Sequence, residues 1–136
     1  MLLSGMTEYD LHMMCVEYLR VRPDKPMFWH TPNGEYRSKS TGARLKRMGT
    51  LPGVSDLFIA QPNQFAHGLF IELKRDWKSK CTSNQKIFLK EVHERGYAVT
   101  VQHDFDIICS CIDSYLSGKL LWTTWLTTYL PNFLLK

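Results

Sequence analysis

The chain has 136 residues, a formal net charge of +4, 44% hydrophobic residues and 22% charged residues, which are ordinary values for one soluble globular domain. No apolar run reaches the length of a transmembrane helix, and the apolar residues 1–6 are too few for a signal peptide. The four cysteines show neither the spacing of a zinc site nor that of a disulfide framework. We therefore expect reduced thiols in a cytoplasmic, intracellular protein with no membrane partner.

The N-terminal part of the sequence predicts one helix followed by a turn. Thr7 can cap a helix over residues 7–20, whose apolar residues recur at helical spacing. A short apolar piece at residues 27–30 leads into Thr-Pro-Asn-Gly at 31–34, which is typical of a turn.

A basic segment follows this turn. Between residues 36 and 48 the chain carries five cations and no acid, and we expect a short helix at residues 43–48. Such a segment suits a polyanion, most simply nucleic acid, and a solvated, flexible basic loop is the alternative. The five cations are Arg37, Lys39, Arg44, Lys46 and Arg47.

The remainder of the chain alternates strands and helices. Residues 54–60 and 69–74 read as strands joined by a short connection, which favours an antiparallel hairpin. The pattern then predicts a helix capped by Thr82 or Ser83 and ending near residue 95, a strand over 97–102 and a helix over 105–116. This order predicts an α/β domain with a mixed central sheet flanked by helices.

Residues 119–136 form an aromatic segment, which we interpret as a C-terminal extension of a domain spanning residues 1–118. Trp122 and Trp125 share one helical face with leucines and a tyrosine, and threonines occupy the other face. We expect an amphipathic helix that packs either on this domain or on a partner subunit.

The segment Phe70-Ile-Glu72-Leu-Lys74 places a carboxylate and an ammonium group on one face of a strand. Asp56 begins the preceding strand, so antiparallel pairing would bring it close to Glu72 and Lys74. Two converging carboxylates, with the Leu73 carbonyl, suit a hard cation such as Mg²⁺. The alternative is that Asp56 caps a turn and that Glu72 and Lys74 form a surface ion pair of little energetic value.

Five motifs occur in one order along the chain: Pro32-Asn33-Gly34, Arg-Leu-Lys-Arg-Met-Gly at 44–49, Gly53-Val-Ser-Asp56, Glu72-Leu-Lys74 and Ser83-Asn-Gln85. Together with the elements around them they resemble the VRR-NUC family of the PD-(D/E)XK nuclease superfamily, over about residues 7–116. The resemblance implies a restriction-endonuclease-like fold. It also implies a DNA endonuclease that depends on Mg²⁺ or Mn²⁺.

The resemblance assigns catalytic roles to individual residues. Asp56 and Glu72 would bind the metal, and Lys74 would be the catalytic lysine. Gln85 matches the glutamine that follows this lysine in the family. Glu8 would supply the acid of the first helix, with Glu17 as the alternative.

The chain departs from the family pattern at two positions. Ser55 stands where proline usually precedes the strand aspartate, and His12 stands where the first helix usually carries glutamine. We expect little effect from Ser55, since the carboxylate that follows is kept. For His12 we expect a structural role.

The turn and the basic segment are the predicted DNA contacts. Asn33 and Gly34 would let the backbone approach a phosphate, because glycine removes the steric barrier of a side chain. The five cations would contact phosphates rather than bases. Stand-alone members of the family resemble Holliday-junction resolvases, so we expect a homodimer acting on branched or four-way-junction DNA. A compact, lone nuclease domain would also suit a phage in a bacterial host.

Two other functions stay open at this point. The chain could be a DNA-binding module that has kept the nuclease fold and lost catalysis, or the nuclease subunit of a larger complex. Every central residue is present and no specificity domain accompanies them, which favours the structure-reading nuclease.

Overall fold

A computed structural model describes residues 5–32 and 38–119 of the chain. Its elements are α1 (Glu8–Arg20), β1 (Phe28–His30), α2 (Lys39–Arg47), β2 (Leu57–Ile59), β3 (Leu69–Leu73), α3 (Ser83–Glu94), β4 (Ala98–Gln102) and α4 (Phe105–Leu116). The strands form one sheet in the order β1-β2-β3-β4, with two antiparallel pairs and a parallel pair between β3 and β4. The α/β fold with a mixed sheet and the β2–β3 hairpin are therefore confirmed.

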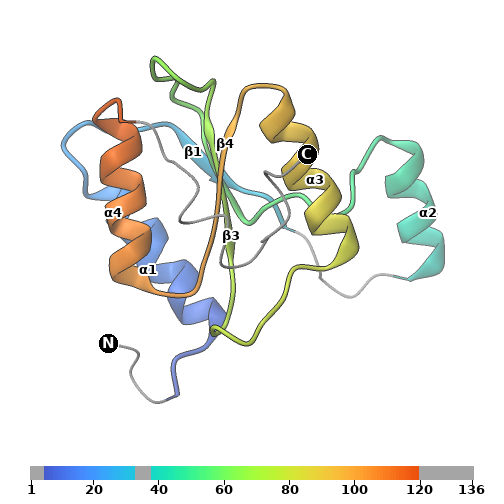
Figure 1. The fold of residues 1–136 in the computed structure, drawn as a ribbon. Coiled ribbons are helices and arrows are strands. Elements are labelled where there is room, and N and C mark those ends of the chain that lie inside the picture. Colours follow the sequence, from blue (N-terminus) through green and yellow to red (C-terminus); the bar gives the residue numbers. More distant parts are fainter. Residues whose placement is uncertain (1–4, 33–37, 120–136) are drawn as a thin grey trace.

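Helices cover both faces of the sheet, with α1 and α4 on one side and α3 on the other (Figure 1). Alternation along β3 sends Leu69, Ile71 and Leu73 into the larger core, where they pack with buried residues of α1 and α4. Phe70, between them, packs on the opposite face against the smaller core under α3. Glu72 shares this second face with Phe70, so its carboxylate lies on the α3 side of the sheet.

Helix boundaries follow their caps. Thr7 caps α1, as the sequence predicts, and Asp10 completes a capping box with it. The helix expected at residues 43–48 begins earlier, at Lys39, because the Ser38 side chain caps it by accepting a hydrogen bond from the Thr41 N–H. None of the described helices is long and apolar enough to cross a membrane. The aromatic segment predicted at the C-terminus lies outside the described residues from residue 120 onward.

The strand predicted over residues 54–60 is shorter in the structure and begins at Leu57. The register pairs Leu57 with Ile71, so a continued ladder would bond the Leu73 N–H to the carbonyl of Ser55. Instead the Leu73 N–H donates to Oδ2 of Asp56 at 2.8 Å. The Asp56 side chain thus takes the place of a backbone acceptor and ends β2.

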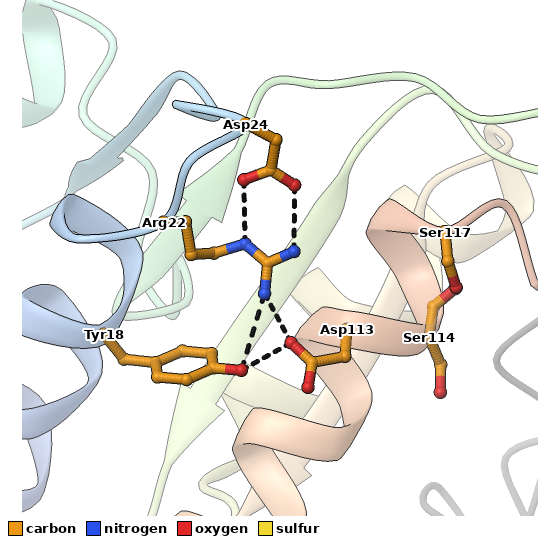
Figure 2. A network of polar contacts seen from close by, with 6 residues as sticks. All are labelled: Tyr18, Arg22, Asp24, Asp113, Ser114 and Ser117. Carbon is orange, nitrogen blue, oxygen red and sulfur yellow. Dashed lines mark hydrogen bonds and ion pairs between the residues drawn. The ribbon is translucent and has the colours of Figure 1, made fainter.

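A polar network ties the C-terminal end of α1 to α4 on the surface (Figure 2). The Arg22 guanidinium donates two hydrogen bonds to Asp24, at 2.9 and 2.8 Å, and also contacts Asp113 of α4. The Tyr18 hydroxyl donates to the same Asp113 carboxylate. These contacts hold the two helices side by side over the larger core.

Candidate active site

Asp56 is held from three directions at the start of β2. Its carboxylate accepts the Leu73 N–H, as described above, and its backbone carbonyl accepts the Thr31 N–H at 3.1 Å. The same carbonyl lies 2.9 Å from Nδ1 of His30, which must carry the proton of that hydrogen bond. Extending the β2–β3 register by one residue places Asp56 opposite Glu72 on the α3 face of the sheet, and the charge of Asp56 acts on Glu72.

Glu72 and Lys74 form a buried ion pair. Their residues are only 3% and 7% exposed, and Lys74 Nζ lies 3.6 Å from Glu72 Oε1. Gln85 of α3 bridges the two: its Nε2 donates to Glu72 Oε1 at 2.7 Å, and its Oε1 accepts from Lys74 Nζ at 2.7 Å. The alternative of a surface ion pair is therefore wrong, since the pair is taken out of water at the expense of its hydration.

The position of Gln85 follows from the start of α3. Thr82 caps this helix, and Oε1 of Gln85 returns to accept the Thr82 N–H at 2.8 Å, completing a capping box. One amide side chain therefore serves the helix end and the ion pair together. Because the cap fixes the rotamer of Gln85, it also fixes where Lys74 Nζ points.

Gly53 brings the turn before β2 against the same helix end. It has a φ of +81°, and a Cβ placed there would lie 2.4 Å from the backbone of Asn84 and 2.7 Å from the Gln85 nitrogen. Such distances leave no room for any side chain, so glycine is required both for its backbone angle and for the close approach. Two of the motifs singled out in the sequence thus touch each other here.

The carboxylates of this region disfavour one another's charge. Burial, followed by the negative charge of Asp56, raises the pKa of Glu72 to about 8, and Lys74 opposes this shift. Partial burial and then Asp56 raise the pKa of Glu8, at the first turn of α1, while Lys74 again opposes the shift. A positive charge added among these acids would therefore be favourable.

Of the two acids considered on the first helix, Glu8 lies within electrostatic reach of Asp56 and Lys74. Glu17 follows nine residues later, about 13 Å further along the helix axis. It is exposed to solvent and directly precedes Tyr18, which belongs to the polar network at the end of α1. The geometry thus brings Glu8, and not Glu17, to the carboxylate cluster.

The donor set fits a hard divalent cation that keeps several waters. Among the described residues, no group of three or more His, Cys, Asp or Glu side chains is arranged to hold a metal ion. Two carboxylates, Asp56 and Glu72, are nevertheless adjacent, and the Leu73 N–H faces Asp56, so the Leu73 carbonyl points to the same side of the strand. Mg²⁺ typically accepts one or two carboxylates and completes its shell with water.

His12 packs against His30 beside this cluster. The two rings meet edge to face with centroids 4.5 Å apart, and burial followed by the charge of His30 lowers the pKa of His12. This contact supports the structural role expected for His12. Ser55, where proline is usual, is buried, and its hydroxyl has no hydrogen-bond partner among the described residues.

The predicted DNA contacts divide into two groups. Asn33, Gly34 and Arg37 lie outside the described residues. The other four cations all belong to α2, where every one of them is exposed. They are Lys39, Arg44, Lys46 and Arg47.

No sequence pattern predicts the contacts that hold Asp56 in place from β1 and the residue after it. His30, the last residue of β1, lies 26 residues upstream of Asp56, and Thr31 follows it directly. Only the antiparallel pairing of β1 with β2 brings the two to Asp56. The short length of β1 hides this pairing from any periodicity argument, because three residues are too few to show an alternation.

Comparison with solved structures places this chain beside a VRR_NUC domain protein. A solved structure described as a VRR_NUC domain protein superposes with a TM-score of 0.73 and 28% sequence identity, over 86% of this chain and 93% of that chain. Searches against protein-family models and against curated proteins find no match. The likeness extends well beyond the sheet, since it covers 86% of the chain.

Proposed function

Because this chain folds as a VRR-NUC domain, a domain of the nuclease type, we propose that it is a divalent-metal-dependent endonuclease that hydrolyses phosphodiester bonds in DNA. The observation that carries this proposal is the buried Glu72–Lys74 pair, bridged by Gln85 and adjacent to Asp56. A buried ion pair is a poor way to stabilise a fold, and burial together with Asp56 raises the pKa of Glu72 despite Lys74, so the negative charge of Glu72 is only partly compensated.

We assign the metal to Asp56, Glu72 and the Leu73 carbonyl. Mg²⁺ or Mn²⁺ bound there would polarise a phosphate oxygen and lower the pKa of a bound water. Lys74, which Gln85 orients by the bond to its ammonium group, would hold the attacking water or stabilise charge that develops on the phosphate. Glu8 would complete the acidic rim at the N-terminal end of α1, facing Asp56.

We further propose that the substrate is branched DNA, such as a four-way junction, and that a homodimer cuts it. One domain of this size offers a single set of Asp56, Glu72 and Lys74, so symmetric cutting of two strands needs two copies. The competing proposal is a DNA-binding module without catalysis. The buried Glu72–Lys74 pair beside Asp56 favours the enzyme, since a binding module has no need of a buried, destabilising carboxylate.

The test uses end-labelled DNA in three forms of matched sequence: a four-way junction, a flap and a plain duplex. Cleavage is measured with Mg²⁺, with Mn²⁺ and with EDTA, for the parent chain and for Lys74→Ala. We expect metal-dependent cleavage that falls by about 100-fold or more in the variant, the size of effect seen when one transition-state contact is removed. Paired cuts on the junction would support the dimer.

Lys78→Ala is the matched control. The segment Asp76-Trp-Lys78 repeats the acid-x-lysine spacing of Glu72-Leu-Lys74, but Lys78 is exposed and lies in the loop after β3. The Lys78→Ala variant should cleave DNA at the same rate as the parent chain. If the folded parent chain binds the junction without cleaving it, the nuclease proposal is wrong and the binding module takes its place. If Lys74→Ala and Lys78→Ala lose cleavage to the same extent, Lys74 has no specific role in catalysis.

A further inference from the structure

Helix α2 differs from every other helix of the described chain, because none of its residues is buried. It spans nine residues, Lys39–Arg47, and lies at the periphery of the molecule beyond α3 (Figure 1). It carries four cations and no acid. A helix of this kind receives almost no stabilisation from the core.

The cations of α2 occupy one side of the helix. At 100° per residue, Lys39, Lys46 and Arg47 surround the direction of Ala43, and Arg44 flanks them. Leu45 lies on the opposite side, and Gly42 lies between it and Lys46; these two are the only half-buried positions of the helix, and its other seven residues are exposed. The charged side of α2 therefore faces solvent.

Several features weaken α2 when it stands alone. Isolated helices shorter than about 12–15 residues are marginal in water. Gly42 lies inside the helix, where glycine is less favourable than alanine, and Lys39 brings a positive charge to the positive end of the helix dipole. Arg44 and Arg47 also repel each other at a spacing of three residues. Only the Ser38 cap and the cations of the last turn act in the other direction.

A row of phosphates would remove most of these penalties at once. It would neutralise the like charges along α2 and would place negative charge near Lys39. We propose that α2 is only marginally stable in the free protein and becomes a fully formed helix when its Lys39–Lys46–Arg47 side binds the phosphate backbone of DNA. This inference rests on the proposed function, because it takes DNA as the partner.

The test changes helix propensity without changing charge. A Cβ added at Gly42 meets nothing within 4 Å, so Gly42→Ala stabilises the helix and adds no contact. Ala43→Gly acts in the opposite direction. The double variant Gly42→Ala/Ala43→Gly restores the composition and serves as the matched control for any direct effect of the Ala43 methyl group.

Affinity for a duplex and for a four-way junction is measured by fluorescence anisotropy in EDTA, so that cleavage does not interfere. We expect Gly42→Ala to bind up to about five-fold more tightly, Ala43→Gly to bind more weakly by a similar factor, and the double variant to resemble the parent. The thermal midpoint should stay the same in all three, because α2 contributes nothing buried to the core. Arg47→Gln should weaken binding through loss of a phosphate contact.

Hydrogen exchange gives an independent readout. Amides 42–48 should exchange rapidly in the free protein and slowly in the complex, whereas amides of α4 should not change. Equal affinities for the parent, Gly42→Ala and Ala43→Gly, or full protection of these amides without DNA, would overturn the coupling while leaving the nuclease proposal intact. Failure of the folded parent chain to bind any DNA would instead overturn the proposed function, and this inference with it.

Discussion

Two networks of charged side chains in this molecule differ in almost every physical respect. On the surface, Arg22 donates hydrogen bonds to both carboxylate oxygens of Asp24 and also contacts Asp113 (Figure 2). The hydrogen bond with Arg22 lowers the pKa of Asp24. On the α3 side of the sheet, Glu72 and Lys74 are buried, and burial together with Asp56 raises the pKa of Glu72. Both networks join an acid to a base.

The difference lies in which charges find compensation. The surface network satisfies its carboxylates with several donors, so nothing is gained by adding an ion. The buried network holds a carboxylate whose negative charge is disfavoured, so a bound cation would stabilise it. The direction of the pKa shift, rather than the presence of an ion pair, thus separates a structural contact from a candidate site.

The largest expected effect comes from Glu72 and pH. Its pKa is raised from 4.5 to about 8 on folding, so the folded state binds the proton more tightly than the unfolded state. The stabilisation from this proton is complete below pH 4.5 and is lost as the pH rises to about 8. For the metal-free protein we therefore expect the free energy of unfolding to decrease between pH 4.5 and about pH 8. Glu72 alone should account for a decrease on the order of 4 kcal/mol. Urea unfolding in EDTA between pH 4 and 8 measures it.

Glu72→Gln isolates this contribution, because the amide does not titrate. The variant should show a flatter pH profile than the parent, and saturating Mg²⁺ at pH 8 should stabilise the parent more than the variant. Glu94→Gln is the control: Glu94 is an exposed acid of α3, and its variant should keep the slope of the parent. Identical pH profiles of the unfolding free energy for the parent and Glu72→Gln would show that the pKa of Glu72 is not raised in the folded protein.

The next effect comes from the turn that supports the site. Gly53 and Gly118 have the same φ of +81°, but only at Gly53 would a Cβ strike the backbone of Asn84 and Gln85. Gly118→Ala should therefore cost about 1–2 kcal/mol of folding free energy, which is the price of the backbone angle. Gly53→Ala should cost about 1–3 kcal/mol more, because the turn and α3 must separate.

Separation at this point would also displace Gln85 from Lys74. We therefore expect Gly53→Ala to cleave DNA more slowly than Gly118→Ala at a temperature where both variants are folded. Thermal unfolding and DNA cleavage rates, measured in parallel for Gly53→Ala and Gly118→Ala, test this expectation. Equal stability of the two variants would mean that the approach of Gly53 to α3 is looser than the structure shows.

The smallest effect is expected from the surface network. Asp113→Asn removes the charge that Tyr18 and Arg22 share, but all of these contacts lie in or near solvent. We expect the free energy of unfolding to fall by no more than about 1 kcal/mol, with DNA cleavage unchanged. A loss as large as that of Gly53→Ala in urea unfolding would contradict the contrast between the two networks.

The sequence predicted most of the elements and the meeting of Asp56, Glu72 and Lys74, because both rest on local signals. Caps and apolar spacing marked α1, α3 and α4, and a short connection between two strands implied the hairpin that brings the acids together. These signals act over a few residues, so they survive without knowledge of the rest of the chain.

The remainder depends on contacts between distant segments. No local sequence pattern predicts that Gly53 lies against the backbone of Asn84, or that His30 donates a hydrogen bond to the carbonyl of Asp56. The early end of β2 has the same origin, because it arises only when the Asp56 side chain captures the Leu73 N–H across the hairpin. Burial of the Glu72–Lys74 pair likewise depends on α3, which follows nine residues later.

The capture of the Leu73 N–H by Asp56 has a bearing on how such a chain would change during evolution. Asp56 ends a strand as well as lining the site, so a descendant that had abandoned catalysis would still be selected to keep it. Glu72 has no such second duty and is costly to bury without a cation. If the proposed function holds, retention of the aspartate alone in a relative carries little information about activity, and loss of the glutamate is the change that we expect in a relative without cleavage.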